Sequence, residues 1–337
     1  MTQVSIVVPV YHNAKSLPDL LERLDRVAGG NPEYEFEFVF VDDGSADNSF
    51  DVLQDLLSKD DRVRIVKLSR NFGSNPATIA GLNAATGDAV AAVAADLQDS
   101  PELIGDMLAH WRDGAKVVLA VRKGRNDPGL TSLLSSIFYA LFRRLAIASM
   151  PRGGFDFFLI DRQVCDLIRG FGETNMYIMG LILWLGFRPV ELPYVREQRP
   201  ARYGRSMWSL TRRIKYFIDS FVAFSYVPIR IASVLGLGLS FVGLAYALVV
   251  VFTRVLRGYQ PEGWASLMVV VLVVSGIQLF IMGILGEYLW RTLDVARRRP
   301  QYIIERRLGF PESDVKTSRS PEARSRHRTL DAQTIDR

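Results

Sequence analysis

Two long segments in the second half of the chain carry no charged residue, namely residues 231–253 and 265–286. A helix rises about 1.5 Å per residue, so each segment is long enough to cross a hydrocarbon core of about 30 Å. Two buried core helices are the alternative interpretation, but uncharged runs of this length favour membrane spans. We therefore expect an integral membrane protein with a large polar domain preceding the spans.

Basic residues gather on both sides of these apolar segments. They precede the first at Arg202, Arg205, Arg212, Arg213, Lys215 and Arg230, and they follow the second at Arg291, Arg297, Arg298, Arg299, Arg306 and Arg307. By the positive-inside rule, both ends of the chain are expected in the cytoplasm. Nucleic-acid binding is the rival explanation of the net charge of +5, but a position beside membrane spans favours anionic lipid headgroups. We therefore expect a membrane partner and no nucleic acid.

The N-terminus and the cysteine content both favour a reducing compartment for the polar domain. We expect no cleavable signal peptide before Val4, because the chain enters a short apolar strand without a basic leader. Cys165 is the only cysteine, so an intramolecular disulfide is excluded.

Short apolar runs alternate with helical patterns through the polar domain. Strands are expected over residues 4–10, 36–41, 63–68, 90–95 and 115–121, with helices over 16–27 and 47–58. Later strands are expected within residues 155–162 and 187–195. Strand and helix in alternation are typical of a parallel, doubly wound α/β sheet.

Carboxylates follow two of the expected strands. Asp42 and Asp43 come after the second strand, and Asp96, Gln98 and Asp99 come after the strand at 90–95. The Ser-Pro-Glu run at 100–102 predicts a helix start with serine as the cap. Ligands of open α/β sheets bind outside the carboxyl ends of the strands, so we expect these side chains at one edge. An ordinary acidic turn is the alternative for the second cluster taken alone.

Basic and glycine-containing loops accompany the carboxylates. Gly73 would allow a ligand close to the backbone, and Arg70 could pair with phosphate. Arg122 and Arg125, at the end of another strand, would either neutralise a diphosphate or form a solvated turn. Hard oxygen ligands beside such cations suit a nucleotide diphosphate with Mg²⁺ or Mn²⁺.

Asp156 lies within an aromatic run that predicts a buried strand. A buried lone carboxylate is costly unless it is paired or functional, so Asp156 is a candidate for chemistry. Residues 130–147 and 208–226 have the amphipathic, aromatic pattern of helices in the headgroup region. Residues 199–205 predict a flexible basic loop, and the polar tail from residue 311 predicts disorder.

Together these motifs resemble the family-2 inverting glycosyltransferases. Within that family the chain is similar to the polyprenyl-phosphate glycosyltransferases, which include dolichyl-phosphate mannose synthases and bacterial undecaprenyl-phosphate glucosyltransferases. The resemblance covers residues 4–307 and is specific for the family but not for the sugar. It implies a Rossmann-like, A-type glycosyltransferase domain with interfacial helices and two C-terminal transmembrane helices.

The resemblance assigns roles to residues of this sequence by their match to the family motifs. It implies Asp156 and Arg202 as catalytic residues, Asp96 and Gln98 as metal ligands, and Pro9, Tyr11, Asp42, Asp43, Asn71, Gly73, Arg122, Arg125 and Ser206 as donor-binding residues. Asp43 is the nearer match to the family's base or ribose contact. Residues 80–82 and 87–88 resemble the segment that shapes the donor pocket, residues 202–206 a mobile loop that closes on the phosphates, and residues 283–291 with 299–300 the exit of the second membrane helix.

Three positions depart from the family pattern. Ala94 stands where an Asp usually completes the metal motif, which would leave the ion to Asp96, Gln98, the donor phosphates and water. Phe155 and Phe158 flank the Asp-Phe pair at 156–157 where the family commonly has Gly and Arg, so a charge that could orient Asp156 is lost. His12 replaces a frequent Asn and bears on a local donor contact.

The resemblance implies transfer of a single sugar from a nucleotide-diphosphate sugar, UDP-linked in the family pattern, to undecaprenyl phosphate with inversion. The product would serve cell-envelope glycan modification at the bacterial inner membrane, with the catalytic domain cytoplasmic and homo-oligomers assembled through the membrane helices. The expected divisions are a catalytic domain at 1–205, an interfacial helix at 206–230 and a pair of transmembrane helices at 231–290. A juxtamembrane segment at 291–310 and a disordered tail at 311–337 follow. Alternatives are a processive polysaccharide synthase, a catalytically weakened membrane scaffold and a small flippase.

Overall fold

The computed structural model of the chain describes residues 1–122, 143–144, 147, 149–151, 154–171, 177–196, 227–257 and 263–311. The expected interfacial helices, the basic loop at 199–205 and the tail lie wholly or largely outside these residues.

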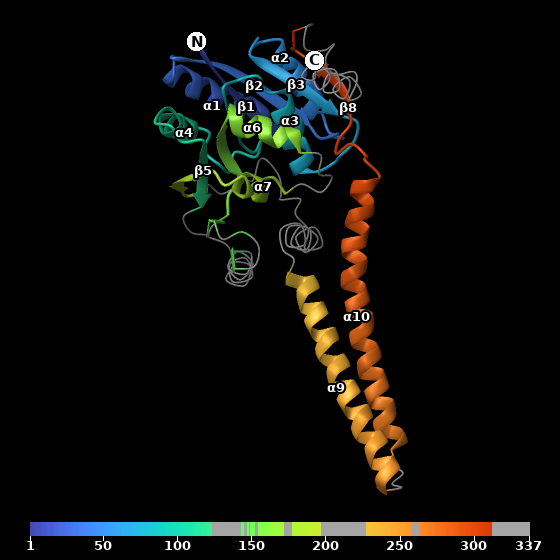
Figure 1. Ribbon diagram of the computed structural model, residues 1–337. Helices are drawn as coiled ribbons and strands as arrows, with labels where there is room; N and C mark the ends of the chain where they lie inside the picture. Colours follow the sequence, from blue (N-terminus) through green and yellow to red (C-terminus); the bar gives the residue numbers. More distant parts are fainter. Residues whose placement is uncertain are drawn as a thin grey trace, which may run out of the picture.

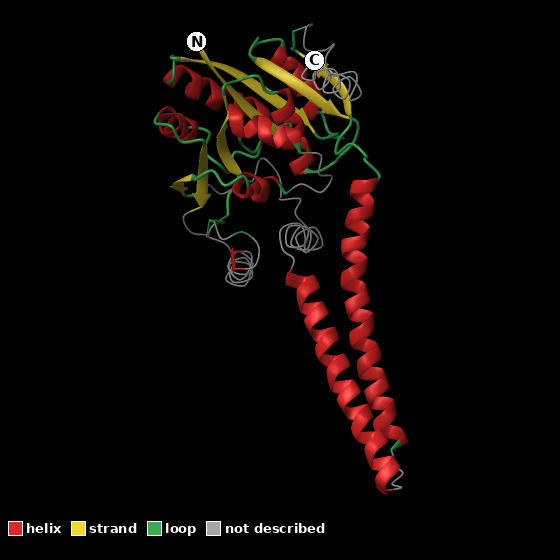
Figure 2. Cartoon of the chain, in the orientation of Figure 1, coloured by secondary structure: helices red, strands yellow, loops and turns green. Residues whose placement is uncertain are grey.

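The polar domain is built on one mixed sheet with the strand order β7-β5-β6-β4-β1-β2-β3-β8 (Figures 1 and 2). Its strands are β1 Thr2–Val10, β2 Tyr34–Asp42, β3 Val63–Leu68, β4 Ala89–Ala92, β5 Val117–Arg122, β6 Phe157–Asp161, β7 Val190–Tyr194 and β8 Ile304–Leu308. β6 runs antiparallel to β4 and β5, and β8 runs antiparallel to β3. The expected doubly wound α/β sheet is therefore confirmed as a mixed sheet, in which the predicted strand β6 runs against its neighbours.

Helices cover both faces of the sheet. They are α1 Leu17–Gly30, α2 Ser49–Leu57 and α4 Leu103–Arg112 on one face, and α3 Ser74–Ala84, α6 Arg162–Gly170 and α7 Ile178–Trp184 on the other. Each face of the sheet has its own hydrophobic core, and alternate residues of β2 point into one or the other. Phe38 and Phe40 pack with α1 and α2, while Val39 and Val41 pack with α3. Burial on both faces explains why the central strands read as continuous apolar runs.

The segment between β4 and α4 is longer than the sequence pattern predicted. β4 ends at Ala92, and α4 begins at Leu103 with Glu102 at its cap position, not with Ser100. The Ser100 hydroxyl instead donates to Glu102, at 2.6 Å, and Arg23 of α1 pairs with the same carboxylate. Ten residues of irregular chain, 93–102, are thereby anchored at the sheet edge. The helix α3 also begins early, at Ser74, within the expected loop.

Two long helices project from the polar domain as a hairpin (Figure 1). They are α9 Val227–Arg257 and α10 Trp264–Ala296. Their apolar stretches, Ile229–Phe252 and Leu267–Ala296, have mean hydropathies of 2.4 and 2.6, and none of the most apolar window of either is buried. Both helices are thus long and apolar enough to span a membrane. Core helices of a soluble domain would instead be buried by the rest of the chain.

The chain returns from α10 to the sheet through β8, a strand that was not predicted from the sequence. β8 pairs with β3, and the Ser69 amide donates to the Ile303 carbonyl at 2.9 Å. Lys67 and Glu305 form an ion pair of 3.1 Å across the two strands. Since β8 is antiparallel to β3, its first residue lies at the carboxyl end of β3. The helix α10 therefore joins the sheet at the carboxyl edge.

Candidate active site at the carboxyl edge

The functional side chains expected from the sequence converge on the carboxyl edge of the sheet. β1, β2, β4, β5 and β7 all end there, and β6 begins there because it runs the other way. This arrangement places Asp42 and Asp43 at the same edge as Asp96, as predicted. It also brings to this edge Arg122, the last residue of β5, and Asp156, which lies just before the start of β6.

Asp43 joins the exit of β2 to the loop before α3. Its Oδ1 accepts a hydrogen bond from the Phe72 amide at 2.7 Å, and its Oδ2 accepts one from the Gly73 amide at 2.8 Å. Gly73 has φ 104°, a backbone conformation that favours glycine. Burial raises the pKa of Asp43 to about 6, against the two amide hydrogen bonds that lower it. The geometry thus brings Asp43, Asn71 and Gly73 together, with the carboxylate holding the loop.

Asp42 and the exit of β1 form the neighbouring part of the edge. Asp42 is fully buried, its Oδ1 accepts from the Ser45 amide at 3.2 Å, and its Oδ2 has no hydrogen-bond partner among the described residues. Burial raises the pKa of this carboxyl. Beyond Pro9, the Tyr11 ring stacks on His12 with centroids 4.2 Å apart.

His12 ties the exit of β1 to the exit of β2. Its Nε2 accepts from the Ala46 amide at 3.0 Å, and its own amide donates to the Ser45 hydroxyl at 3.1 Å. The residue has φ 54°, which is uncommon outside glycine. The departure from the family's Asn therefore has a structural use, because the imidazole reaches a backbone amide of the adjoining loop.

Asp96 and Gln98 lie in the irregular segment after β4. Asp96 Oδ1 accepts from the Gln98 amide at 3.2 Å, and Asp96 Oδ2 lies 3.9 Å from an Arg196 nitrogen. Both side chains are half-buried. Among the described residues, no group of three or more His, Cys, Asp or Glu side chains could hold a metal ion.

Asp156 differs from its predicted environment. It precedes β6 instead of lying inside a strand, and its side chain is 44% exposed, so it is not a buried lone carboxylate. Its partner is Arg122, whose side chain is only 7% exposed and forms an ion pair with Asp156 Oδ2. Burial alone would lower the pKa of Arg122, but Asp156, Tyr194 and Asp99 raise it above its usual value. Asp156 is therefore paired with a cation from β5, whereas the ring of Phe158 is buried in the core.

Three further residues complete this part of the edge and were not among the predicted site residues. Asp99 is fully buried and accepts a hydrogen bond from the Tyr194 hydroxyl, and Arg196 Nε lies 3.3 Å from Asp99 Oδ1. Burial raises the pKa of Asp99, and burial together with Asp99 raises that of Tyr194. Asp99 was visible in the sequence as part of the acidic cluster. Tyr194 and Arg196 had no local signal, because only the pairing of β7 with β5 brings them here.

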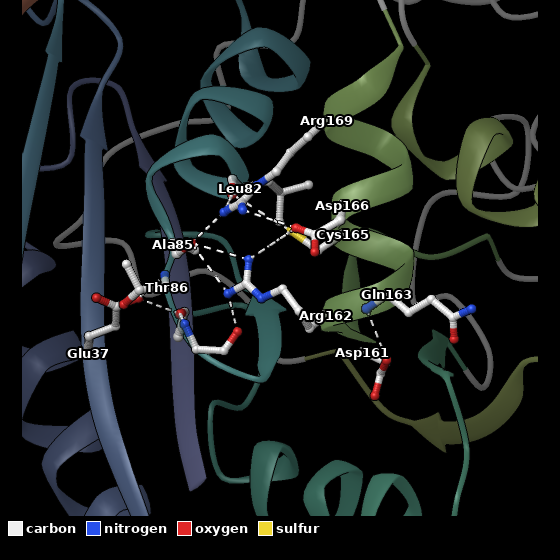
Figure 3. A network of polar contacts seen from close by, with 12 residues as sticks. Glu37, Leu82, Ala85, Thr86, Asp161, Arg162, Gln163, Cys165, Asp166 and Arg169 are labelled. Carbon is white, nitrogen blue, oxygen red and sulfur yellow. Dashed lines mark hydrogen bonds and ion pairs between the residues drawn. The ribbon is translucent and has the colours of Figure 1, made fainter. Parts of the chain in front are cut away.

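Residues 87–88, expected beside the donor pocket, lie at the opposite edge of the sheet. Gly87 packs against β1, where a Cβ would approach the Ser5 amide nitrogen to 2.6 Å, and Asp88 accepts from the Gln3 amide at 3.0 Å. Figure 3 shows the adjoining network, in which Arg162 and Arg169 of α6 point toward the carbonyl groups at the end of α3. The two arginines complement the C-terminal dipole of α3.

Arg125, Arg202 and Ser206 lie outside the described residues, so their predicted roles remain predictions.

Comparison with known proteins identifies the family to which the chain belongs. The model of glycosyl transferase family 2 matches residues 5–169, which include Asp42, Asp43, Asp96, Arg122 and Asp156. A relative described as the uncharacterized glycosyltransferase YkcC of Bacillus subtilis is 37% identical over 309 residues, covering 91% of this chain and 95% of that protein. The chain belongs to glycosyltransferase family 2. As a member of it, the protein is a glycosyltransferase with a Rossmann-like A-type fold.

The C-terminal helices carry a second family signature. Residues 227–291, which form α9 and most of α10, match the GtrB C-terminal hairpin. The prophage bactoprenol glucosyl transferase homolog of Escherichia coli K12 is 33% identical to this glycosyltransferase over 309 residues, covering 90% of the chain and 99% of that protein. Among solved structures, the mannosyltransferase PcManGT of Pyrobaculum calidifontis, in complex with GDP-Man and Mn²⁺, is 18% identical with a TM-score of 0.47. That match covers 66% of this chain and 64% of the other.

Proposed function

We propose that this glycosyltransferase moves one sugar from a nucleotide-diphosphate sugar to polyprenyl phosphate at the membrane surface, with inversion. The observation that carries the proposal is the position of the candidate site. Asp43, Asp96, Arg122 and Asp156 occupy the sheet edge at which α10 also joins the sheet. A bilayer around α9 and α10 would therefore lie on the side of the molecule that the site faces. Relatives named as bactoprenol glucosyl transferases support a polyprenyl acceptor.

The donor is assigned to the β1 and β2 side of the edge. The aromatic pair Tyr11 and His12 would receive the nucleoside, with the buried Asp42 beneath them at the exit of β2. Asp43 would act by holding the loop of Asn71 and Gly73, which would place its backbone close to the donor. A UDP-linked sugar is the proposed donor, on the strength of the family resemblance of these motifs.

The acceptor is assigned to the β5 and β6 side. A lipid phosphate with a second pKa of about 6 is mostly a dianion at pH 7 and can attack the anomeric carbon directly. Asp156, held by Arg122, would orient this phosphate or take its residual proton. Attack from the face opposite the nucleotide inverts the anomeric centre. Most of the rate enhancement would come from alignment and from stabilisation of the leaving diphosphate.

A divalent cation fits this edge only together with the donor. Mg²⁺ is commonly bound by one or two carboxylates plus substrate phosphates. The half-buried Asp96 would supply one such carboxylate, and Gln98 lies beside it in the same turn. The ion, Mg²⁺ or Mn²⁺, would neutralise charge on the diphosphate. Ala94 contributes no ligand, so we propose that the affinity for the ion depends on bound nucleotide.

The proposed setting is the bacterial inner membrane, with both ends of the chain in the cytoplasm and α9 and α10 spanning the bilayer. The proposed divisions keep residues 1–205 and 231–290 as the catalytic and membrane units. β8 extends the catalytic sheet with a strand from beyond the spans. Assembly through the membrane helices and a role in cell-envelope glycan modification are further parts of the proposal.

The test of the assigned roles is single-turnover transfer from a labelled nucleotide sugar to undecaprenyl phosphate by the full-length chain. We expect Asp156→Asn to lower the rate constant about 100-fold or more, as for loss of a positioned proton acceptor. We expect chelator and Asp96→Ala to abolish most transfer. Asp106→Asn, on the exposed side of α4, is the matched control and should leave the rate unchanged. Equal rates for Asp156→Asn and the control would contradict the assignment.

A further inference from the structure

A connected series of polar side chains runs from the donor side of the site toward its acceptor side. At the donor end, Arg196 lies between two carboxylates, 3.9 Å from Asp96 Oδ2 and 3.3 Å from Asp99 Oδ1. The same Asp99 oxygen accepts the hydrogen bond of the Tyr194 hydroxyl. The β4 exit is thus tied to the end of β7 by two contacts to one buried carboxylate.

The series continues from Tyr194 to the acceptor end. Tyr194 lies directly opposite Arg122 in the register of the parallel strands β7 and β5, so the two side chains emerge side by side on the same face of the sheet. Arg122 in turn holds Asp156 in an ion pair. Through these steps the ends of β4, β7, β5 and the start of β6 share one network.

Burial makes this arrangement costly, which favours a functional reason for it. Asp99 is fully buried and Tyr194 is 6% exposed. Water therefore solvates neither the carboxylate nor the hydroxyl to any great extent. Replacing a buried charged network with packed apolar residues is often neutral or stabilising. Around the network the same strands are apolar, as at Ala120 and Phe157. Stability alone therefore gives little reason to place a carboxylate here.

We propose that Asp99 and Tyr194 are positioning residues that hold Arg122, and through it Asp156, in a fixed place relative to Asp96. The inference rests on the proposed function, in which Asp96 serves the donor and Asp156 the acceptor phosphate. Side chains joined in a buried network stiffen one another, and small displacements of a reacting group lower the rate strongly. Asp99 and Tyr194 themselves touch neither substrate.

This placement predicts a particular division between rate and binding. Loss of the Tyr194 hydroxyl would leave the donor-side residues Asp43 and Gly73 untouched and keep Arg196 beside Asp99, so the donor KM of Tyr194→Phe should stay within about twofold. The chemical step should slow, by about 10- to 100-fold, which is the effect of losing one hydrogen bond to a charged group. A residue needed only for folding would lower the amount of active protein instead.

The experiment measures single-turnover transfer by full-length Tyr194→Phe, Asp99→Asn and the double variant. At saturating enzyme, a single-turnover rate constant does not depend on the fraction of protein that is folded. Tyr302→Phe is the matched control, because it also removes one tyrosine hydroxyl with a hydrogen bond, here 2.8 Å to Asn83, but lies outside the network. We expect slow single variants, a double variant no slower than the slower single one, and an unchanged control.

Three results would overturn the inference. An unchanged rate constant in Tyr194→Phe would show that the hydroxyl does not position Arg122. Losses that multiply in the double variant would show that the two residues act separately. A tenfold loss in the Tyr302→Phe control would show that the effect is not particular to the network. Failure of the proposed function would look different, since the wild-type chain would then yield no lipid product and the inference would fall with it.

Discussion

Asp43 links two loops at the carboxyl edge through its two carboxylate oxygens. Each carboxylate oxygen accepts one backbone amide, and the ionised form is the one that can accept both. Burial nevertheless raises the pKa of Asp43 to about 6. Two effects therefore oppose each other at this side chain. The amide hydrogen bonds favour the ionised carboxylate, whereas burial disfavours it.

The pH dependence of stability tests this opposition. The pKa of Asp43 is higher in the folded chain than its ordinary value of 3.8, so the folded state binds the proton more tightly. Ionisation as the pH rises from about 4 to about 6 then costs stability, by at most about 3 kcal/mol. In urea unfolding followed in detergent, Asp43→Asn should show a flatter pH profile over that window than the wild type. Identical profiles would exclude Asp43 as the source.

At the same scale, the sequence indicated most site residues but not their environments. Asp42, Asp43, Asp96 and Arg122 follow strands, and a strand end is a local feature. Asp156 was expected inside a buried strand because its neighbours are aromatic, yet the chain turns just before β6 and leaves it half-exposed. Tyr194 escaped prediction because its role depends on the pairing of β7 with β5, which no local pattern encodes.

Among the elements, β8 decides how the membrane pair is joined to the catalytic sheet. It pairs with β3, and residue 303 just before it holds the amide of Ser69, the first residue of the donor loop. The strand was not predicted because its sequence, Ile-Glu-Arg-Arg-Leu, is short and charged. Such charge is typical of an edge strand, which natural sheets protect against pairing with other chains. The direction of β6 was likewise not predictable, whereas the helices and strands of residues 1–121 were largely correct.

Truncation tests the contribution of β8. Ending the chain after Arg299 removes β8 and exposes the edge of β3, so we expect a lower thermal unfolding temperature and weaker nucleotide binding, measured by calorimetry. Ending it after Pro311 keeps every contact of β8 and should change neither quantity. Equal behaviour of the two truncated chains would contradict a structural role for this strand.

For the whole molecule, the account requires both chain ends on one side of the membrane and the turn between α9 and α10 on the other. The chain suits a labelling test, because its only cysteine, Cys165, is buried. In intact cells, Gln260→Cys should react with a membrane-impermeant maleimide, whereas Ser320→Cys should react only after permeabilisation. The reverse pattern would place the candidate site on the wrong face of the membrane for a cytoplasmic nucleotide sugar.

The account as a whole holds that a donor site and a lipid-phosphate site meet at the sheet edge nearest the bilayer. The most direct measurement incubates the full-length protein, in liposomes with undecaprenyl phosphate, with each of a panel of radiolabelled nucleotide sugars, and then extracts the lipid. We predict one labelled lipid, formed from one donor with a single added sugar and lost when the phosphate acceptor is omitted. Absence of labelled lipid with every donor, from protein that still binds nucleotide, would contradict the account.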